Sequence, residues 1–146
     1  MQYFLMKSEP DAFSWDDLCR KGPSMWDGVR NYTARNFLRA MQVGDLAIFY
    51  HSNIGKACVG ICQVVQTSYT DPTAGDDLRW SVVDVQAVVP LQVPVTLEQI
   101  KQAALPGGPL DGIRMLRENR LSVVPLQAHE WQWILQMAQT ADPTPE

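Results

Sequence analysis

Four short stretches of this sequence combine polar, charged and aromatic side chains in patterns that suit ligand binding. They are KSEP at residues 7–10, WDGVRNY at 26–32, YHSN at 50–53 and the glycine within ACVGIC at 57–62. Each lies where a regular element is expected to end or turn, and side chains at such positions can converge on a ligand. These stretches therefore supply the candidate site residues of the chain.

The KSEP stretch directly follows the first expected strand, residues 2–7. Lys7 supplies a cation and Ser8 a hydroxyl group, and the Glu9 carboxylate offers two acceptor oxygens that suit an exocyclic amine such as N4 of cytosine. The alternative is a strand that leaves the core for solvent and ends at Pro10. The spacing of these residues leaves both interpretations open.

The WDGVRNY stretch places a tryptophan, a glycine and an arginine before an expected helix. Gly28 permits a tight turn, so that Trp26 and Arg30 can face the same space. Trp26 offers a flat aromatic face for a base, and Arg30 offers a phosphate contact or a stacking plane. Asn31 is a helix cap, an amide that reads a base edge, or both. The alternative is a core tryptophan beside a capped helix.

The YHSN stretch ends a buried strand and raises the question of catalysis. Tyr50 and Ser52 lie on one side of that strand and His51 on the other, so Ser52 and His51 cannot form a nucleophile–base pair. Lys7 and Ser8 are also adjacent on a strand and point to opposite faces, so they cannot form such a pair either. The sequence contains no triad pattern, phosphate-binding loop, dinucleotide fingerprint or metal-dependent motif. We therefore expect a binding protein that is not an enzyme.

The cysteines and histidines indicate neither a disulfide nor a metal centre. Cys58 and Cys62, together with Cys19, form an odd set, and four residues along a strand separate the first two by roughly 13 Å. Reduced, mostly buried thiols are the expectation. His51 and His129 have no ligand partner nearby in the sequence. We therefore predict no metal ion and no cofactor.

Charge is unevenly distributed along the chain. The formal net charge is −4, which by itself argues against a nucleic-acid partner. Residues 18–44, however, contain five basic residues and one acid, and residues 112–120 contain three arginines and one glutamate. A protein that is acidic overall can therefore present a basic face. Charge alone leaves this interpretation and that of scattered, solvated charges open.

The hydrophobic pattern predicts a single α+β domain. We expect strands over 2–7, 46–52, 57–66, 80–89 and 120–126, and helices over 14–20, 32–42, 96–103, 111–118 and 128–138. Neighbouring strands interrupted by short helices favour a mainly antiparallel, partly closed sheet. Residues 69–77 read as a loop, and Gly60 indicates a bulge or the close approach of another group. The domain is expected to span 1–138, with a flexible tail over 139–146.

No apolar run in the sequence is long enough to span a bilayer. The first ten residues, MQYFLMKSEP, lack the basic and apolar segments of a secretory signal. We therefore expect no membrane partner and a cytoplasmic protein, or a nuclear one if the source is a eukaryote.

Together, these stretches resemble the EVE domain family. The resemblance rests on YFLMKSEPDAFSWDDL, MWDGVRNYTARNFLRAMQVGDLAIFYHSN, the glycine strand, DPTAG, RWSVVDVQ, GGPL and RLSVVPL, which follow the family's order over about residues 3–136. It implies a PUA-like fold, in which a mixed, mainly antiparallel pseudo-barrel sheet is flanked by short helices. The chain is also similar, more distantly, to YTH domains. One departure is that TDPTAGDDL replaces a longer, tyrosine-bearing insert common in the family.

The resemblance implies a reader of a modified nucleobase, with 5-methylcytosine and its oxidised forms as ligands. The base would leave its stack in DNA or RNA and enter an aromatic pocket, with Trp26 as one wall and Tyr50 or Trp80 as another. The implied ligand-binding residues are Lys7, Ser8, Glu9, Trp26, Val29, Arg30, Asn31, Tyr50, His51, Ser52 and Trp80, and the implied phosphate-binding residues are Arg30, Arg35, Arg39 and Lys56. We expect a monomer with a nucleic-acid partner.

Two other functions remain as alternatives. The ASCH domains, which are PUA-like relatives, hydrolyse modified nucleosides with a lysine and a carboxylate. Lys7 and Glu9 are two residues apart on a strand and can share a face, so a small hydrolase is one alternative. A protein-interaction module with a vestigial pocket is the other.

Overall fold

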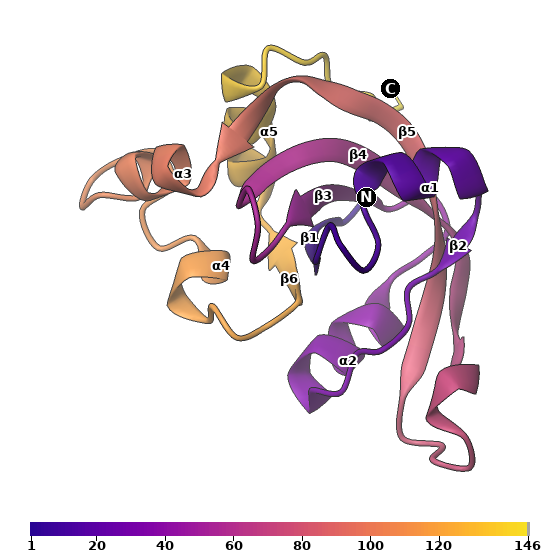
Figure 1. The fold of residues 1–146 in the computed structure, drawn as a ribbon. Coiled ribbons are helices and arrows are strands. Elements are labelled where there is room, and N and C mark those ends of the chain that lie inside the picture. Colours follow the sequence, from indigo (N-terminus) through magenta and orange to yellow (C-terminus); the bar gives the residue numbers. More distant parts are fainter. Residues whose placement is uncertain (146) are drawn as a thin grey trace.

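The computed structural model describes residues 1–145, and its centre is a curved, six-stranded sheet (Figure 1). Its strands are β1 (Tyr3–Ser8), β2 (Ser24–Met25), β3 (Leu46–His51), β4 (Ala57–Thr70), β5 (Ser81–Thr96) and β6 (Val123–Leu126). Its helices are α1 (Trp15–Lys21), α2 (Tyr32–Ala40), η1 (Pro72–Ala74), α3 (Leu97–Ala103), α4 (Arg114–Arg117) and α5 (Ala128–Met137). The strand order is β2-β5-β4-β3-β1-β6, in which β1 and β3 are parallel and the other neighbours antiparallel.

The predicted α+β architecture with a mainly antiparallel sheet is confirmed, although three strand assignments were wrong. The two-residue strand β2 was not predicted, and β4 continues to Thr70, where a loop was expected from residue 69. Strand β5 extends to Thr96 instead of ending at Val89. The long mutual pairing of β4 and β5 explains both extensions. Pro90 is accommodated because it lies opposite Gly60, beside a register shift where a ladder hydrogen bond is already interrupted.

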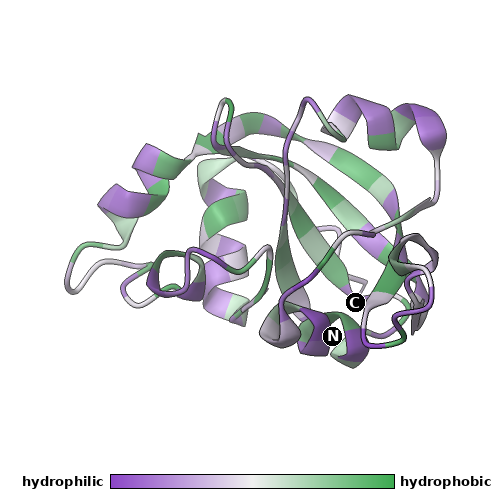
Figure 2. Cartoon of the chain, turned by 60° about the horizontal axis from the view of Figure 1, so that its bottom comes forward, coloured by the Kyte–Doolittle hydropathy of each residue, from purple (hydrophilic) through white to green (hydrophobic). Residues whose placement is uncertain are grey.

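The core lies between the sheet and the apolar faces of the helices. Figure 2 shows the central strands mostly green, while the helices carry both hydrophobic and hydrophilic residues. Ala34 and Leu38 of α2 and its C-cap Met41 are buried, whereas Arg39 is exposed. The helix begins at Asn31, whose side chain accepts a hydrogen bond from the Ala34 N–H at 3.0 Å. Among residues 1–145, no helix has the length and apolar character needed to cross a membrane.

Four rings surround the fully buried Phe49 of β3. Trp15 and Trp26 meet it edge-on, at centroid distances of 5.6 and 5.4 Å, and Phe13 and His51 also lie against it. The residue opposite Phe49 on β4 is Gly60. A Cβ atom at Gly60 would lie 2.5 Å from the Trp15 ring. The predicted close approach of another group at Gly60 is therefore confirmed. Through this contact Trp15 packs α1 against the sheet.

The C-terminal segment after α5 makes contacts with two strands. Thr140 accepts a hydrogen bond from the Gln92 N–H at 2.9 Å, and the Thr144 and Tyr3 hydroxyls are 3.0 Å apart. The flexibility expected for residues 139–146 stays a prediction, and Glu146 lies outside the described residues.

Replacing Gly60 with alanine is expected to destabilise the fold, because the new methyl group has no room beside the Trp15 ring. Overpacking of this kind costs about 1–3 kcal/mol, measurable as a lower free energy of unfolding in urea. In a Trp15→Leu background the same substitution should cost less, since the ring is gone. Equal costs in the two backgrounds would show that the Trp15 contact is not the reason for glycine.

Candidate functional site

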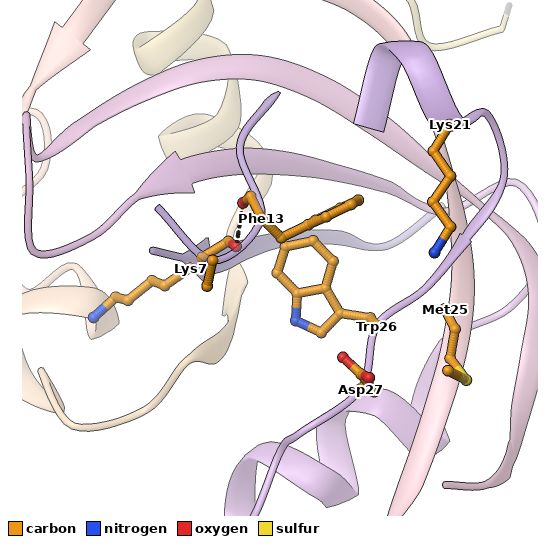
Figure 3. Close-up of a pocket in the computed structure, with 8 residues that line it drawn as sticks. Lys7, Phe13, Lys21, Met25, Trp26 and Asp27 are labelled. Carbon is orange, nitrogen blue, oxygen red and sulfur yellow. Dashed lines mark hydrogen bonds between the residues drawn. The ribbon is translucent and has the colours of Figure 1, made fainter. Parts of the chain in front are cut away.

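A cavity of about 340 Å³ opens beside Trp26, between the end of β1, the segment before α1, and β2 (Figure 3). It combines two aromatic rings, a thioether, two lysines, a carboxylate and a hydroxyl group. Its lining residues are Lys7, Ser8, Ala12, Phe13, Lys21, Met25, Trp26 and Asp27. Of the sequence-predicted residues, it brings together Lys7, Ser8 and Trp26.

Trp26 belongs both to the core and to this cavity. Its backbone N–H donates to the Val83 carbonyl of β5 at 2.8 Å, and its ring meets Phe49 edge-on. Only 6% of the residue is exposed, so Trp26 is more buried than a freely accessible stacking plate would be. The interpretation of Trp26 as a core tryptophan is confirmed, and its role as a flat face for a base stays a prediction. The core packing keeps the indole rigid where it lines the cavity.

The cavity contains both acceptor groups and ammonium donors. The Ser8 hydroxyl donates to the Phe13 carbonyl at 2.6 Å, which leaves its oxygen lone pairs as acceptors. In Figure 3 the Asp27 carboxylate lies next to the indole of Trp26. The Lys21 ammonium lies 5.9 Å from the centre of the Phe13 ring. A ligand with an N–H edge and a flat apolar body suits this combination.

A buried carboxylate holds the turn that follows Trp26. Asp71 is fully buried and accepts from the Gly28 N–H at 3.1 Å, from Arg30 at 2.8 Å and from both the N–H and the hydroxyl of Thr73. Burial by itself raises the pKa of Asp71, but the hydrogen bonds from Thr73, Arg30 and Gly28 outweigh it and bring the pKa to about 2. Gly28 has a φ of +78°, which favours glycine.

The helix α1 is attached to β3 through a histidine. The Nε2 atom of His51 accepts the Trp15 N–H at 3.1 Å, so this nitrogen is unprotonated and the ring proton lies on Nδ1. Burial lowers the pKa of His51, and the Asp16 charge opposes that effect. Ser14 and Asp17 form a capping box at the start of the helix. His51 therefore positions the wall that contains Phe13.

The other predicted ligand-binding residues lie outside this cavity. Val29 is buried in the core, and Asn31 caps α2. Tyr50 is on the opposite face of the β1–β3 pair from Trp26, because it is the register partner of Lys7 whereas Phe49 and His51 face the tryptophan. Glu9 and Ser52 line an adjoining cavity of about 560 Å³, together with Ser8 and Asp27.

Trp80 belongs to a separate aromatic group. It is 8% exposed, stacks on the half-exposed Tyr32 at 5.1 Å and donates its indole N–H to Asp77 at 3.0 Å. The interpretation that Tyr50 or Trp80 forms a second wall beside Trp26 is therefore not supported. The ring that stands next to Trp26 in the cavity is Phe13.

The arginines of the basic segment differ in their partners. Arg30 is paired with the buried Asp71. Arg35 and Arg39 both donate to the carbonyl oxygen of Arg79, at 3.1 and 3.2 Å, and Arg39 also donates to Ser81. Within residues 1–145 no carboxylate lies within ion-pair distance of these two guanidinium groups. They therefore form a small, uncompensated positive surface, whereas the charge of Arg30 is neutralised.

Sequence reasoning missed five residues of the cavity: Ala12, Phe13, Lys21, Met25 and Asp27. Asp27 lies inside the WDGVRNY motif and could have been noticed as a neighbour of Trp26. Phe13 lies just before α1 and Lys21 is its last residue, and only the packing of Trp15 on Gly60 brings that helix here. No local signal marked them.

Lys7 and Glu9, the lysine and carboxylate of the hydrolase alternative, both line the cavity of about 560 Å³. The Lys7 ammonium extends away from Trp26 in Figure 3 and donates to the Asn119 carbonyl at 3.2 Å. No ion pair joins Lys7 to Glu9 among the described residues. Within residues 1–145 there is also no group of histidines, cysteines and carboxylates arranged to hold a metal ion.

The family model of the EVE domain matches residues 2–137. The chain belongs to the EVE domain family. It is 40% identical to thymocyte nuclear protein 1 of Mus musculus, in an alignment that covers 94% of this chain and 74% of that protein. The family resemblance seen in the sequence is confirmed.

Solved EVE structures have the same fold. Protein Atu2648 of Agrobacterium tumefaciens superimposes with a TM-score of 0.93 at 40% identity, covering 100% of both chains. Human THYN1, solved in complex with DNA that contains 5-methylcytosine, superimposes with a TM-score of 0.91 at 34% identity, over 97% of this chain and 100% of that one. A YTH domain of Zygosaccharomyces rouxii, at 14% identity and a TM-score of 0.53 over 97% of this chain and 88% of that one, shares the fold alone. The PUA-like fold is confirmed.

Asp71→Asn is expected to destabilise the EVE domain at neutral pH by about 2 kcal/mol, since it removes a charged acceptor from four donors. The pKa of Asp71 is about 2 in the folded chain and near 4 in an unfolded one, so its contribution is complete above about pH 4 and is lost as the pH falls through 2. Urea unfolding from pH 2 to 7 should show the two proteins converging at low pH. The control is Asp76→Asn, an exposed aspartate in the same loop. A pH-independent difference between wild type and Asp71→Asn would contradict this.

Proposed function

We propose that this EVE domain binds a 5-modified cytosine, flipped from a DNA or RNA strand, in the cavity beside Trp26. Human THYN1, which has the same fold and was solved with DNA containing 5-methylcytosine, supports the choice of ligand. The observation that supports the choice of place is the cavity itself. Its two aromatic residues, Trp26 and Phe13, stand beside the acceptor groups of Ser8 and Asp27.

The polar lining matches the edge of cytosine. Cytosine presents an N4 amine, which is a donor, beside the acceptors N3 and O2. The Asp27 carboxylate and the Ser8 oxygen accept from the amine, and the ammonium group of Lys21 donates to an acceptor. A flipped base costs a few kcal/mol in lost stacking, which contact with Trp26 and Phe13 replaces. Because Phe49 and the Val83 carbonyl already hold Trp26, the binding of a base does not have to order the indole.

The 5-methyl group would lie against apolar atoms of Met25 or Phe13. Burying one methyl group is worth about 0.8 kcal/mol, which corresponds to a roughly fourfold preference over unmodified cytosine. This site would thus distinguish the two bases by a small difference in affinity, and most of the affinity itself would come from contacts with the base and the phosphates.

Phosphate contacts come from Arg35 and Arg39. These guanidinium groups have no carboxylate partner within residues 1–145, and Arg39 contacts Ser81, two residues from the Val83 carbonyl that holds Trp26. Arg30 instead holds the turn through Asp71.

Trp26→Leu is expected to weaken binding to an oligonucleotide with one 5-methylcytosine by about 10-fold or more, because stacking on an aromatic ring is worth about 1–3 kcal/mol. Fluorescence anisotropy with matched DNA and RNA oligonucleotides, modified and unmodified, measures the change. Circular dichroism checks that the variant folds. The control is Trp133→Leu on α5, where the tryptophan is 37% exposed and outside the cavity. The proposal would be contradicted if the wild type bound modified and unmodified strands equally and Trp26→Leu bound both with the same affinity as the wild type.

The double variant Arg35→Gln/Arg39→Gln should weaken binding to modified and unmodified strands by the same factor. Its plot of log affinity against log salt concentration should be shallower by about 2, since two phosphate contacts are lost. The matched control, Arg20→Gln/Arg117→Gln, changes the net charge equally at positions that line neither the Trp26 cavity nor this surface. The same effect in both double variants would mean that only overall charge matters.

A further inference from the structure

A second cleft, of about 480 Å³, lies on the other face of β1 and β3. In Figure 1 the turn between β3 and β4 approaches α3 and α4 at this place. The cleft is lined by three lysines, Lys7, Lys56 and Lys101, and by Tyr50, Leu97 and Met115 among others. None of these groups takes part in the cavity beside Trp26 except Lys7.

Strand alternation explains why the two cavities are separate. Lys7 and Tyr50 are register partners on the parallel strands β1 and β3, so their side chains leave the sheet on the same face. Phe49 and His51 leave it on the opposite face, where they contact Trp26 and Trp15. Figure 3 accordingly shows the Lys7 ammonium directed away from Trp26.

The second cleft is positively charged and has no compensating acid. No carboxylate lines it, and within residues 1–145 Lys7, Lys56 and Lys101 form no ion pair. Lys7 is half-buried, and this burial lowers its pKa, because a charged amine loses hydration there. In a chain whose net charge is −4, three unpaired ammonium groups around one cleft select an anion.

The floor of the cleft suits a flat, partly apolar group. Leu97, Met115 and Leu116 supply apolar atoms. Tyr50 is 4% exposed, and its hydroxyl makes no hydrogen bond to any described residue of the chain. Burial raises the pKa of Tyr50 to about 12, so the hydroxyl keeps its proton and can donate it. Tyr50 lines the cleft, so its hydroxyl can donate to an acceptor atom of a ligand there.

The two cavities are joined around the ends of the strands. A third cavity contains Lys7 and Ser8, which line the Trp26 cavity, and Ser52 and Asn119, which line the lysine cleft together with Lys7. A chain of nucleotides that passes the ends of β1 and β3 can therefore occupy both.

We propose that the lysine cleft is a second nucleotide subsite, which binds the base and phosphate of the unit next to the cytosine held beside Trp26. This inference rests on the proposed function for its identity as a neighbouring unit. The chemistry of the cleft, a flat base over an apolar floor with its phosphate among three lysines, is the same for a free mononucleotide.

Two methionines allow the cavities to be observed separately. Met25 lines the Trp26 cavity and Met115 lines the lysine cleft. With ¹³C-methyl methionine, NMR titration of the full chain with 5-methyldeoxycytidine should shift the Met25 signal and leave Met115 in place. Deoxythymidine 5′-monophosphate should shift Met115, and a dinucleotide of the two units should shift both and bind about 10-fold more tightly than the nucleoside.

The decisive variant is Lys56→Gln/Lys101→Gln. It should lower dinucleotide affinity about 10-fold without changing affinity for the nucleoside, and it should abolish the Met115 shift with the mononucleotide. The charge-matched control Arg20→Gln/Arg117→Gln should leave all of these values unchanged. A dinucleotide that binds no more tightly than the mononucleotide would overturn the neighbouring-unit assignment and favour a free nucleotide.

The outcomes separate the two proposals. If Met25 does not respond to the modified nucleoside while Met115 responds to the mononucleotide, the proposed function fails and the nucleotide cleft stands. If the Met115 signal responds to neither phosphate-containing probe, and the double lysine variant binds the dinucleotide as wild type does, the subsite is overturned whatever happens at Trp26.

Discussion

The shape of the Trp26 cavity depends on the contact of two tryptophan rings with Phe49, beside the side-chain-free backbone of Gly60. Trp15 can meet Phe49 edge-on only because Gly60 leaves room for its ring. Trp15 is the first residue of α1 and Phe13 lies just before it, so the same contact positions the aromatic wall opposite Trp26. Edge-to-face pairs add about 0.5–1.5 kcal/mol to the burial of the rings. One packed cluster thus determines both the stability of this end of the sheet and the width of the cavity.

Hydrogen bonds to Asp71 hold the turn that follows Trp26, in addition to the packing of the aromatic rings. The turn at Gly28 exposes backbone donors that no helix or strand satisfies, and the buried Asp71 accepts from one of them and from Arg30. A buried carboxylate is tolerated here because it has several charged or strongly polar donors. The result is that Arg30, which in sequence looks like a free cation, is a structural residue. Arg35 and Arg39 of α2 and the three lysines of the cleft, by contrast, have no ion-pair partner among the described residues.

At the ends of the parallel strands β1 and β3, the two faces of the sheet carry different side chains and line different cavities. Ser8 and His51 end these strands on the side of Trp26, and Lys7 and Tyr50 precede them on the side of α3 and α4. Positive charge gathers at this point while the chain as a whole is acidic. An acidic remainder weakens indiscriminate attraction to phosphate backbones, so the proposed binding of a nucleic acid would depend on local contacts.

Local features were read correctly from the sequence, because their causes are local. The cap at Asn31 and the close approach at Gly60 follow from residues a few positions apart or from one residue's missing side chain. The set of residues that line the cavity could not be predicted in the same way. Which ring stands beside Trp26, Phe13 rather than Tyr50, depends on strand pairing and register, and these join segments far apart in the chain. The motifs in the sequence determined which side chains are candidates for the site; only the tertiary structure decided which face of the sheet each of them occupies, because one step along a strand reverses that face.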